Sequence, residues 1–309
     1  MAVNVLVTGG LGFVGSAVVD RLLKSGHHVT VFDDRSRGSA ENVDVDRIVL
    51  FDGDIRNLES LVECVHLGHF DAVIHLAAMH FLPQCNLDPQ GCILTNVVGT
   101  ENMLSACSIG EVPRIIAASS MAVYPISDNA CREEDQVGPY DVYGETKLAN
   151  EMQLRRWSRQ SGGTAVAIRL SNAYGPRETN PHVIPEIMRQ LIEGNIELDL
   201  GNTRPFRDYI HVDDIAAALE RLLVSPLDID FHVYNLGSGK EHNIDEILTC
   251  LGSILDLQIG VRSNPAKVRK IERLHLLPDI RKIAASVGWA PDVGFREGLE
   301  DLCHWYGLL

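Results

Sequence analysis

The sequence lacks the features that mark secreted, membrane and metal-binding proteins. Its seven cysteines are widely spaced and form no CxxC pair, which argues against both a disulfide framework and a zinc site. No run reaches the roughly 18 apolar residues that a membrane helix needs. The N-terminus also has no basic segment followed by a long apolar stretch. We therefore expect a cytoplasmic chain with reduced thiols, no membrane contact and no metal ion.

Basic charge is also scarce. Lysine and arginine number 27 against 42 acidic residues, a formal net charge of −15. Nucleic-acid-binding proteins present a basic face, so this balance argues against that class. The short basic runs at 35–37 and 267–270 are either sites for a phosphate ligand or solvated surface. A length of 309 residues with 45% hydrophobic residues fits a globular protein with one large and one smaller domain.

Short apolar runs alternate with helically spaced segments over the first 170 residues. The pattern predicts strands at 3–8, 28–32, 48–51, 72–78, 114–119 and 165–170. It predicts helices at about 16–25, 58–67, 97–107 and 143–160. The run at 72–78 is almost continuously apolar, as expected for a strand buried on both faces of a parallel sheet. This alternation indicates an α/β fold with a doubly wound parallel sheet of the Rossmann type.

The pattern changes after about residue 172. Prolines at 176, 181 and 185, a helix near 184–193 and short mixed segments follow. Residues 210–224 and 232–235 then look like a return to the main sheet. We therefore expect a dinucleotide-binding Rossmann domain at 1–171 plus about 210–236. A smaller C-terminal α/β substrate-binding domain would comprise 172–209 and 237–309.

A glycine-rich turn joins the first predicted strand to the first predicted helix. Gly9 permits the sharp turn, Gly12 lets the backbone approach a pyrophosphate, and Gly15 lets the helix pack closely on the sheet. The helix N-terminus presents free N–H groups and partial positive charge to phosphates. This spacing, in a strand–turn–helix context, predicts a dinucleotide site.

An acidic residue ends the second predicted strand. Asp33 lies 18 positions after Gly15, where its carboxylate would accept hydrogen bonds from the adenosine ribose and repel a 2′-phosphate. NAD is therefore favoured, although the nearby Arg35 and Arg37 leave NADP open. Asp54, followed by Ile55, either borders the adenine or serves as a turn or N-cap residue.

Tyr143 and Lys147 are four residues apart in a predicted helix and so share one face. A free tyrosine has a pKa of ~10. A lysine ammonium and a positive nicotinamide ring would stabilise the phenolate, so that the tyrosine transfers protons near neutral pH. Ser120 follows a predicted strand at the carboxyl edge of the sheet. Its hydroxyl either binds the reacting substrate oxygen or makes only local turn hydrogen bonds.

Taken together, these residues resemble the extended short-chain dehydrogenase/reductase family, in its NAD-dependent nucleotide-sugar epimerase/dehydratase branch, which includes the UDP-glucose 4-epimerases. The resemblance covers essentially the whole chain. Its markers are residues 8–15, 54–55, 75–78, 96–100, 119–124, 143–147, 169–176 and 207–214.

The resemblance implies a role for each matching residue. Ser120, Tyr143 and Lys147 match the catalytic residues. The cofactor would contact Gly9, Gly12, Phe13, Val14, Gly15, Asp33, Asp34, Arg35, Asp54, Ile55, Leu76, Ala77, Ala78, Asn96, Tyr143 and Lys147. The substrate, a nucleotide-diphosphate sugar with UDP favoured, would contact His80, Ser120, Tyr143, Asn172, His182, Val183, Arg207, Arg269 and Glu272. Arg207 would bind the diphosphate through paired N–H donors.

The family resemblance also bears on the reaction. In a 4-epimerase, Tyr143 would remove the 4-hydroxyl proton while C4 passes hydride to NAD, and the 4-keto sugar would turn over before hydride returns. Dehydratases carry an Asp–Glu pair where this chain has Met121 and Ala122, which disfavours dehydration. A 4-ketoreductase and a non-catalytic NAD-binding regulatory protein stay open. The family also implies a homodimer joined by a four-helix bundle, with helices 97–107 and 143–160 as candidates.

Overall fold

The larger part of the molecule is built on a seven-stranded sheet in which every neighbouring pair of strands is parallel. The computed structural model describes residues 2–268 and 273–309. In spatial order the strands are β10 (Phe231–Leu236), β6 (Thr164–Leu170), β5 (Arg114–Ser120), β4 (Ala72–His75), β1 (Asn4–Thr8), β2 (His28–Asp33) and β3 (Val49–Asp52). The strand order reverses between β1 and β4, and ligands bind at such a reversal in sheets of this type.

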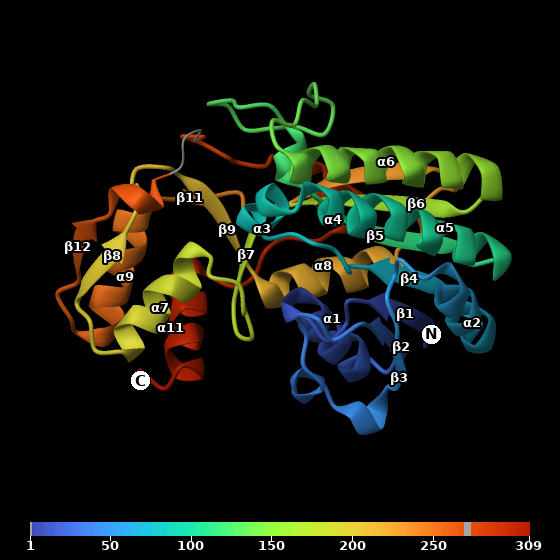
Figure 1. Ribbon diagram of the computed structural model, residues 1–309, viewed down its shortest axis with the longest axis horizontal. Coiled ribbons are helices and arrows are strands. Elements are labelled where there is room, and N and C mark those ends of the chain that lie inside the picture. The colour runs from blue at the N-terminus through green and yellow to red at the C-terminus, as the bar shows by residue number, and fades with distance from the viewer. Residues whose placement is uncertain (1, 269–272) are drawn as a thin grey trace.

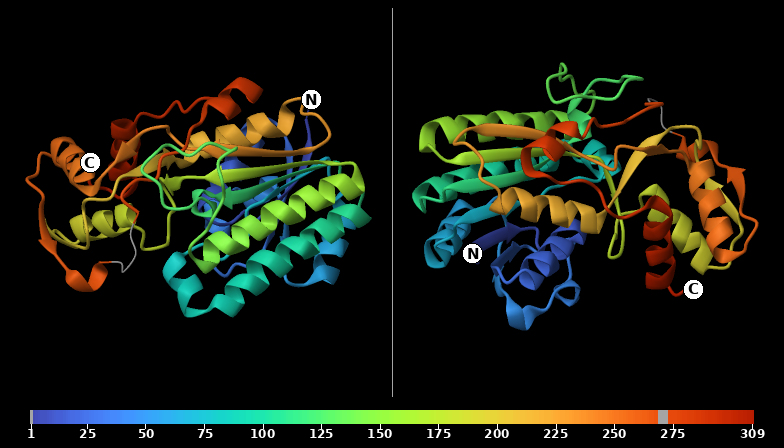
Figure 2. Two further views of the ribbon diagram at one scale, coloured as in Figure 1. Left: turned by 90° about the horizontal axis from the view of Figure 1, so that it is seen from above. Right: turned by 180° about the vertical axis from the view of Figure 1, so that it is seen from behind.

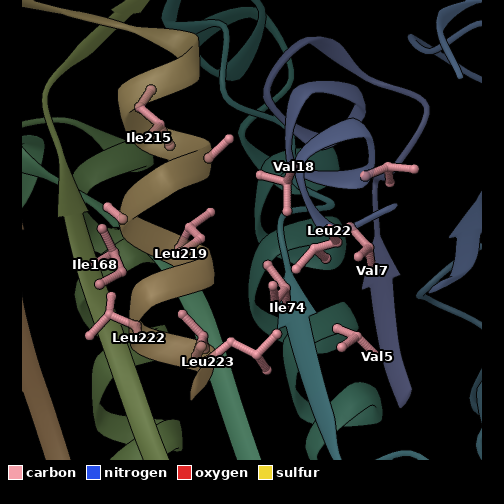
Figure 3. Close-up of a cluster of buried hydrophobic side chains, with 14 of the residues drawn as sticks. Val5, Val7, Val18, Leu22, Ile74, Ile168, Ile215, Leu219, Leu222 and Leu223 are labelled. Atoms are coloured by element: carbon pink, nitrogen blue, oxygen red, sulfur yellow. The ribbon is translucent and has the colours of Figure 1, made fainter. Parts of the chain in front are cut away.

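Helices cover both faces of this sheet (Figure 1). One face carries α1 (Phe13–Lys24), α8 (Val212–Val224) and α10 (Arg281–Val287), and the other carries α2 (Leu58–Gly68), α5 (Gly99–Ile109) and α6 (Val142–Ser161). Figure 3 shows Val18 of α1 and Leu219 of α8 packed over Ile74 and Ile168 of the strands. Burial of apolar side chains on both faces makes the sheet a rigid platform.

A smaller α/β part lies beside the carboxyl edge of the main sheet (Figures 1 and 2). One of its sheets has the order β11 (Glu241–His242), β9 (Arg207–His211), β7 (Asn172–Tyr174), and the other pairs β12 (Gly260–Ser263) with β8 (Glu197–Leu200). Its helices are α7 (Val183–Ile192), α9 (Ile244–Leu255) and α11 (Phe295–Trp305). All of these elements except β11 contribute residues to a hydrophobic core of their own.

A run of helical segments connects β4 to β5. It comprises α3 (Leu82–Leu87), α4 (Pro89–Ile93), a π-helical stretch (Leu94–Val98) and then α5. A single 3₁₀ turn (Met121–Val123) follows β5. None of the helices within residues 2–268 and 273–309 combines the length and the apolar character that crossing a membrane requires.

The predicted α/β fold with a doubly wound parallel sheet is confirmed, and several boundaries are corrected. The first helix begins at Phe13 and not near residue 16, because the glycine turn closes within four residues. Strand β4 ends at His75, since residues 76–81 leave the sheet. The segment 210–224 holds the end of β9 and helix α8, so only β10 returns to the main sheet.

Candidate active site

The glycine turn lies between β1 and α1 and is too crowded for side chains. Gly9 has a φ of +71°, and a Cβ there would lie 2.8 Å from the backbone nitrogen of Ala77. A Cβ on Gly15 would lie 2.0 Å from the carbonyl oxygen of Gly9. Gly12 is the N-cap of α1 and has no side chain to cap the first N–H groups. The uncapped N–H groups at the start of α1 fit a pyrophosphate.

Asp33 ends β2 beside this turn and is buried. Its carboxylate accepts hydrogen bonds from the backbone N–H groups of Leu11, at 3.0 Å, and Arg35, at 2.8 Å. Burial is the main cause of the raised pKa of Asp33, and the two N–H groups oppose it. The carboxylate therefore braces the turn, and each oxygen keeps a further lone pair for a ribose hydroxyl.

Two other charged residues predicted for the cofactor site are engaged with protein partners. The Arg35 guanidinium donates to both carboxylate oxygens of Asp52, at 2.5 and 2.9 Å. Asp54 accepts from the backbone and side chain of Arg56, and this pairing lowers its pKa. The N-cap of α2 is Asn57, so Asp54 is a turn residue and not the N-cap, and its place beside the adenine stays a prediction.

The segment that follows β4 lies where the strand order reverses, and Asn96 links it to helix α6 by hydrogen bonds. Leu76, Ala77 and Ala78 lie here, and the backbone of Leu76 and Ala77 lies against Gly9. Buried Asn96 accepts from the N–H of Met79, at 2.8 Å, and donates to its carbonyl, at 2.9 Å. It also donates to Thr146 Oγ1 on α6, at 3.0 Å. In this structure the Asn96 amide therefore positions the segment, and its predicted contact with the cofactor stays a prediction.

The three predicted catalytic residues meet at the end of β5. Helix α6 begins one residue before Tyr143 because Asp141 caps it, accepting from the N–H of Gly144 at 2.8 Å. The side chains of Ser120 and Tyr143 are hydrogen-bonded to each other. Lys147 Nζ donates to the carbonyl oxygen of Ala118, at 2.8 Å, and lies 5.8 Å from the Tyr143 ring centroid.

Burial dominates the electrostatics of this group. Burial raises the pKa of Tyr143 above its ordinary value, and the hydrogen bond with Ser120 opposes the rise. Burial lowers the pKa of Lys147 to about 8. The protein alone therefore holds Tyr143 neutral, and the phenolate requires further positive charge in the site. Ser120 Oγ also accepts from the N–H of Ala122, at 3.1 Å, so its local turn bond coexists with the bond to Tyr143.

A second group, which we call the histidine cluster, comprises His80, Glu178, Asn180 and His182. The rings of His80 and His182 are 6.1 Å apart, although residue 80 follows β4 and residue 182 precedes α7. Asn180 Nδ2 lies 3.0 Å from His80 Nε2, and Glu178 Oε2 lies 3.5 Å from His182 Nδ1. Desolvation by the surrounding protein is the main cause of the lowered pKa of His80, about 4, and the positive charges of His182 and Lys147 add to it. The cluster therefore lies within electrostatic range of Lys147.

The contacts of His80 restrict what its ring can do. Asn180 Nδ2 is only a donor, so His80 Nε2 must accept. A contact with the Ala78 backbone acts in the opposite direction to burial and favours the protonated ring. His182 is 37% exposed at its side chain, and only its Nδ1 faces Glu178.

The remaining predicted substrate residues lie in the smaller α/β part. Asn172 on β7 donates to the Asp208 carbonyl, at 3.2 Å, and Arg207 on the neighbouring β9 donates to the Phe206 carbonyl, at 2.7 Å. Val183 is the first residue of α7, directly after His182. Arg269 and Glu272 lie outside the described residues, so their assignment stays a prediction.

Sequence reasoning missed Glu178, Asn180 and Glu151. Nothing local to Glu178 or Asn180 points to His80, which lies 100 residues from Asn180. Glu151 had a signal, because it falls four residues after Lys147 and so lies on the face that carries Tyr143.

Comparison with known proteins agrees with this geometry. The model of the NAD-dependent epimerase/dehydratase family matches residues 5–237. A putative UDP-glucose 4-epimerase of Methanocaldococcus jannaschii is 28% identical over 97% of each chain. A dTDP-glucose 4,6-dehydratase of Streptomyces niveus is 30% identical over 98% of this chain and 92% of its own. The structure of Thermus thermophilus UDP-glucose 4-epimerase in complex with NAD matches with a TM-score of 0.90 and 29% identity over 98% of each chain.

Proposed function

Because this chain belongs to the NAD-dependent epimerase/dehydratase family, we propose that it inverts C4 of a nucleotide sugar, with a UDP-sugar as substrate. It is an enzyme of the extended short-chain dehydrogenase/reductase type, and its cofactor is NAD. The observation that carries the proposal is the hydrogen-bonded pair of Ser120 and Tyr143 with Lys147 alongside, at the carboxyl end of β5.

The proposed site for NAD runs from the glycine turn to Lys147. The N-terminus of α1 would bind the pyrophosphate, Asp33 the adenosine ribose and Lys147 the nicotinamide ribose. The crowding at Gly9 and Gly15 keeps the turn tight against the start of α1 and the segment after β4. When bound, NAD supplies the acceptor and the donor of the C4 hydride.

Tyr143 is the proposed acid/base. Its phenolate takes the proton of the sugar 4-hydroxyl and later returns a proton to the oxygen of the turned-over 4-keto sugar. Ser120 holds the same sugar oxygen by a hydrogen bond, which fixes its distance from Tyr143. Lys147 provides positive charge that offsets the burial of the phenolate.

The dehydratase alternative receives less support. Dehydration needs an additional acid and base, which the resemblance places at Met121 and Ala122. Neither side chain transfers a proton. Apart from NAD, the 4-epimerase reaction needs no group beyond Ser120, Tyr143 and Lys147.

The test uses purified protein without added cofactor. Released NAD is measured after heat denaturation, and the protein is incubated with UDP-glucose, UDP-galactose and their N-acetyl forms. We expect bound NAD and interconversion at C4 without net NADH. Stoichiometric consumption of NADH or NADPH with a 4-keto sugar would instead identify a reductase, and turnover of no substrate would favour a regulatory NAD-binding protein.

We also propose a homodimer that packs α5 and α6 of each subunit into a four-helix bundle. The two helices lie side by side (Figures 1 and 2), and Leu94, Val98 and Met152 are exposed on or just before them. A charge at Met152 would be desolvated in such an interface. We expect M152E to be monomeric by light scattering, whereas L67E, at an equally exposed 68% position on α2, stays dimeric. A monomeric wild-type protein would contradict the proposal.

A further inference from the structure

Helix α6 contacts three successive residues at the end of β5. Tyr143, Lys147 and Glu151 are spaced by four residues and lie on one face of the helix. Tyr143 is bonded to Ser120, and Lys147 Nζ to the Ala118 carbonyl. Between these, Ser119 Oγ donates to Glu151 Oε1 at 2.6 Å. The bond between Ser119 and Glu151 therefore lies directly beside the catalytic Ser120. None of the proposed chemical steps uses this bond.

Glu151 is held in turn by Arg169 on the neighbouring strand. Arg169 pairs with Ser119 in the β5–β6 register. Its Nε donates to Glu151 Oε1 at 2.9 Å and its Nη2 to Oε2 at 2.8 Å, with both side chains at most 6% exposed. A two-point guanidinium–carboxylate contact fixes orientation as well as distance.

Arg169 also reaches the turn that follows Ser120. Its Nη1 donates to the Tyr124 hydroxyl at 2.7 Å, and that hydroxyl donates to Asn235 Oδ1 at 2.8 Å. The guanidinium also lies 4.7 Å from the Tyr124 ring centroid. The segments before and after Ser120 are thus both tied to one buried arginine.

We propose that Ser119, Glu151 and Arg169, the Ser119–Glu151–Arg169 network, are positioning residues that set the register between α6 and the end of β5. A buried ion pair stabilises a fold little more than apolar residues would, but it tolerates few geometries. A one-residue slip moves a strand by about 3.3 Å and turns a helix by about 100°. Either change would separate Ser120 from Tyr143. This inference rests on the proposed roles of these two residues.

The test compares two buried serines whose hydroxyls contact α6 or lie on it. S119A removes the bond to Glu151, whereas the control S158A removes the 2.7 Å bond from Ser158 Oγ to the Gly163 carbonyl at the far end of the helix. Each NAD-loaded variant is measured for kcat, KM, retained NAD, Tm and the pH dependence of kcat/KM.

We expect S119A to lose about 10-fold to 100-fold in kcat with KM and retained NAD unchanged, because misplacement by about 1 Å has effects of that size. The acid limb of its kcat/KM profile should move to higher pH, because the Ser120 hydrogen bond that lowers the pKa of Tyr143 is weakened. S119T keeps the hydroxyl donor and should restore kcat and the position of the acid limb. S158A should lower Tm and leave kcat, KM and the pH profile unchanged.

Other outcomes distinguish a failure of the positioning inference from a failure of the proposed function. If S119A and S158A lose the same Tm and both keep the wild-type kcat and pH profile, the network only supports the fold. R169K keeps the charge but not the two-point contact, and it should reproduce the kcat loss of S119A; a wild-type rate there also overturns the inference. If Y143F keeps full activity, the proposed function fails instead.

Discussion

The catalytic group and the histidine cluster lie beside each other but are held in different ways. Ser120, Tyr143 and Lys147 come from the end of a central strand and the first turns of a long helix, and buried hydrogen bonds support them. His80 and His182 come from connecting segments and make ring contacts at 6.1 Å. We propose that regular elements hold the reacting groups, whereas the connecting segments that carry the histidine cluster contact the sugar.

The largest expected effect is on the catalytic group. Y143F removes the proposed acid/base and should lower kcat by about 10²-fold to 10⁴-fold, the range typical of general acid–base catalysis. Retained NAD should be unchanged, because the ring still fills its place. Y140F is the matched control, since Tyr140 is exposed and its ring stacks on the Arg273 guanidinium. Equal activity of the two variants would refute the assignment.

A second prediction separates function from stability within the same group. Burial lowers the folded-state pKa of Lys147 from 10.5 to about 8, so the unfolded chain binds the proton more tightly between these values. The unfolding free energy therefore rises with pH over this interval, and the cost of the buried charge is fully present below pH 8.

K147M should therefore be inactive yet more stable than the cofactor-free wild type at pH 7, by about 1–3 kcal/mol. The gain in unfolding free energy should be smaller than the free energy that corresponds to the whole pKa shift, because the bond from Lys147 to the Ala118 carbonyl is lost. The difference should shrink as pH rises toward 10.5. Urea denaturation at several pH values measures it, with K240M at an exposed position as control. Destabilisation of K147M at pH 7 would contradict the buried-charge account.

The smallest expected effect falls on the histidine cluster. H182A should change the ratio of kcat/KM between UDP-glucose and its N-acetyl form by about 10-fold, because a pocket side chain alters discrimination by this order. The kcat for the preferred sugar should stay within about 3-fold, since no bond to Tyr143 is lost. H304A, at the exposed end of α11, provides the control. An unchanged ratio would remove His182 from substrate choice.

The sequence predicts the features of these two regions that depend on local patterns better than those that depend on contacts between distant segments. The turn from Gly9 to Gly15 and the spacing of Tyr143 and Lys147 are local patterns, and the structure places them in β1–α1 and on α6 as expected. Strand β4 was predicted three residues too long, because Leu76 to Ala78 are apolar where they pack near the glycine turn and not in the sheet.

The remaining contacts depend on tertiary structure. Asn180 meets His80 only because β4 and the segment before α7 converge at the edge of the sheet. Arg169 reaches Ser119 and Glu151 only through the β5–β6 register, which no local pattern encodes. The pKa of Tyr143 likewise depends on burial, which the local spacing of Tyr143 and Lys147 does not encode.

The central claim is that the sugar is oxidised and reduced at C4 within one site. UDP-galactose deuterated at C4 tests it most directly, with the product analysed by NMR and no cofactor added. The account predicts UDP-glucose that keeps the deuterium at C4, because the hydrogen removed from C4 is the one returned to the opposite face. Inversion with loss of deuterium to solvent, or labelled substrate recovered without inversion, would contradict it.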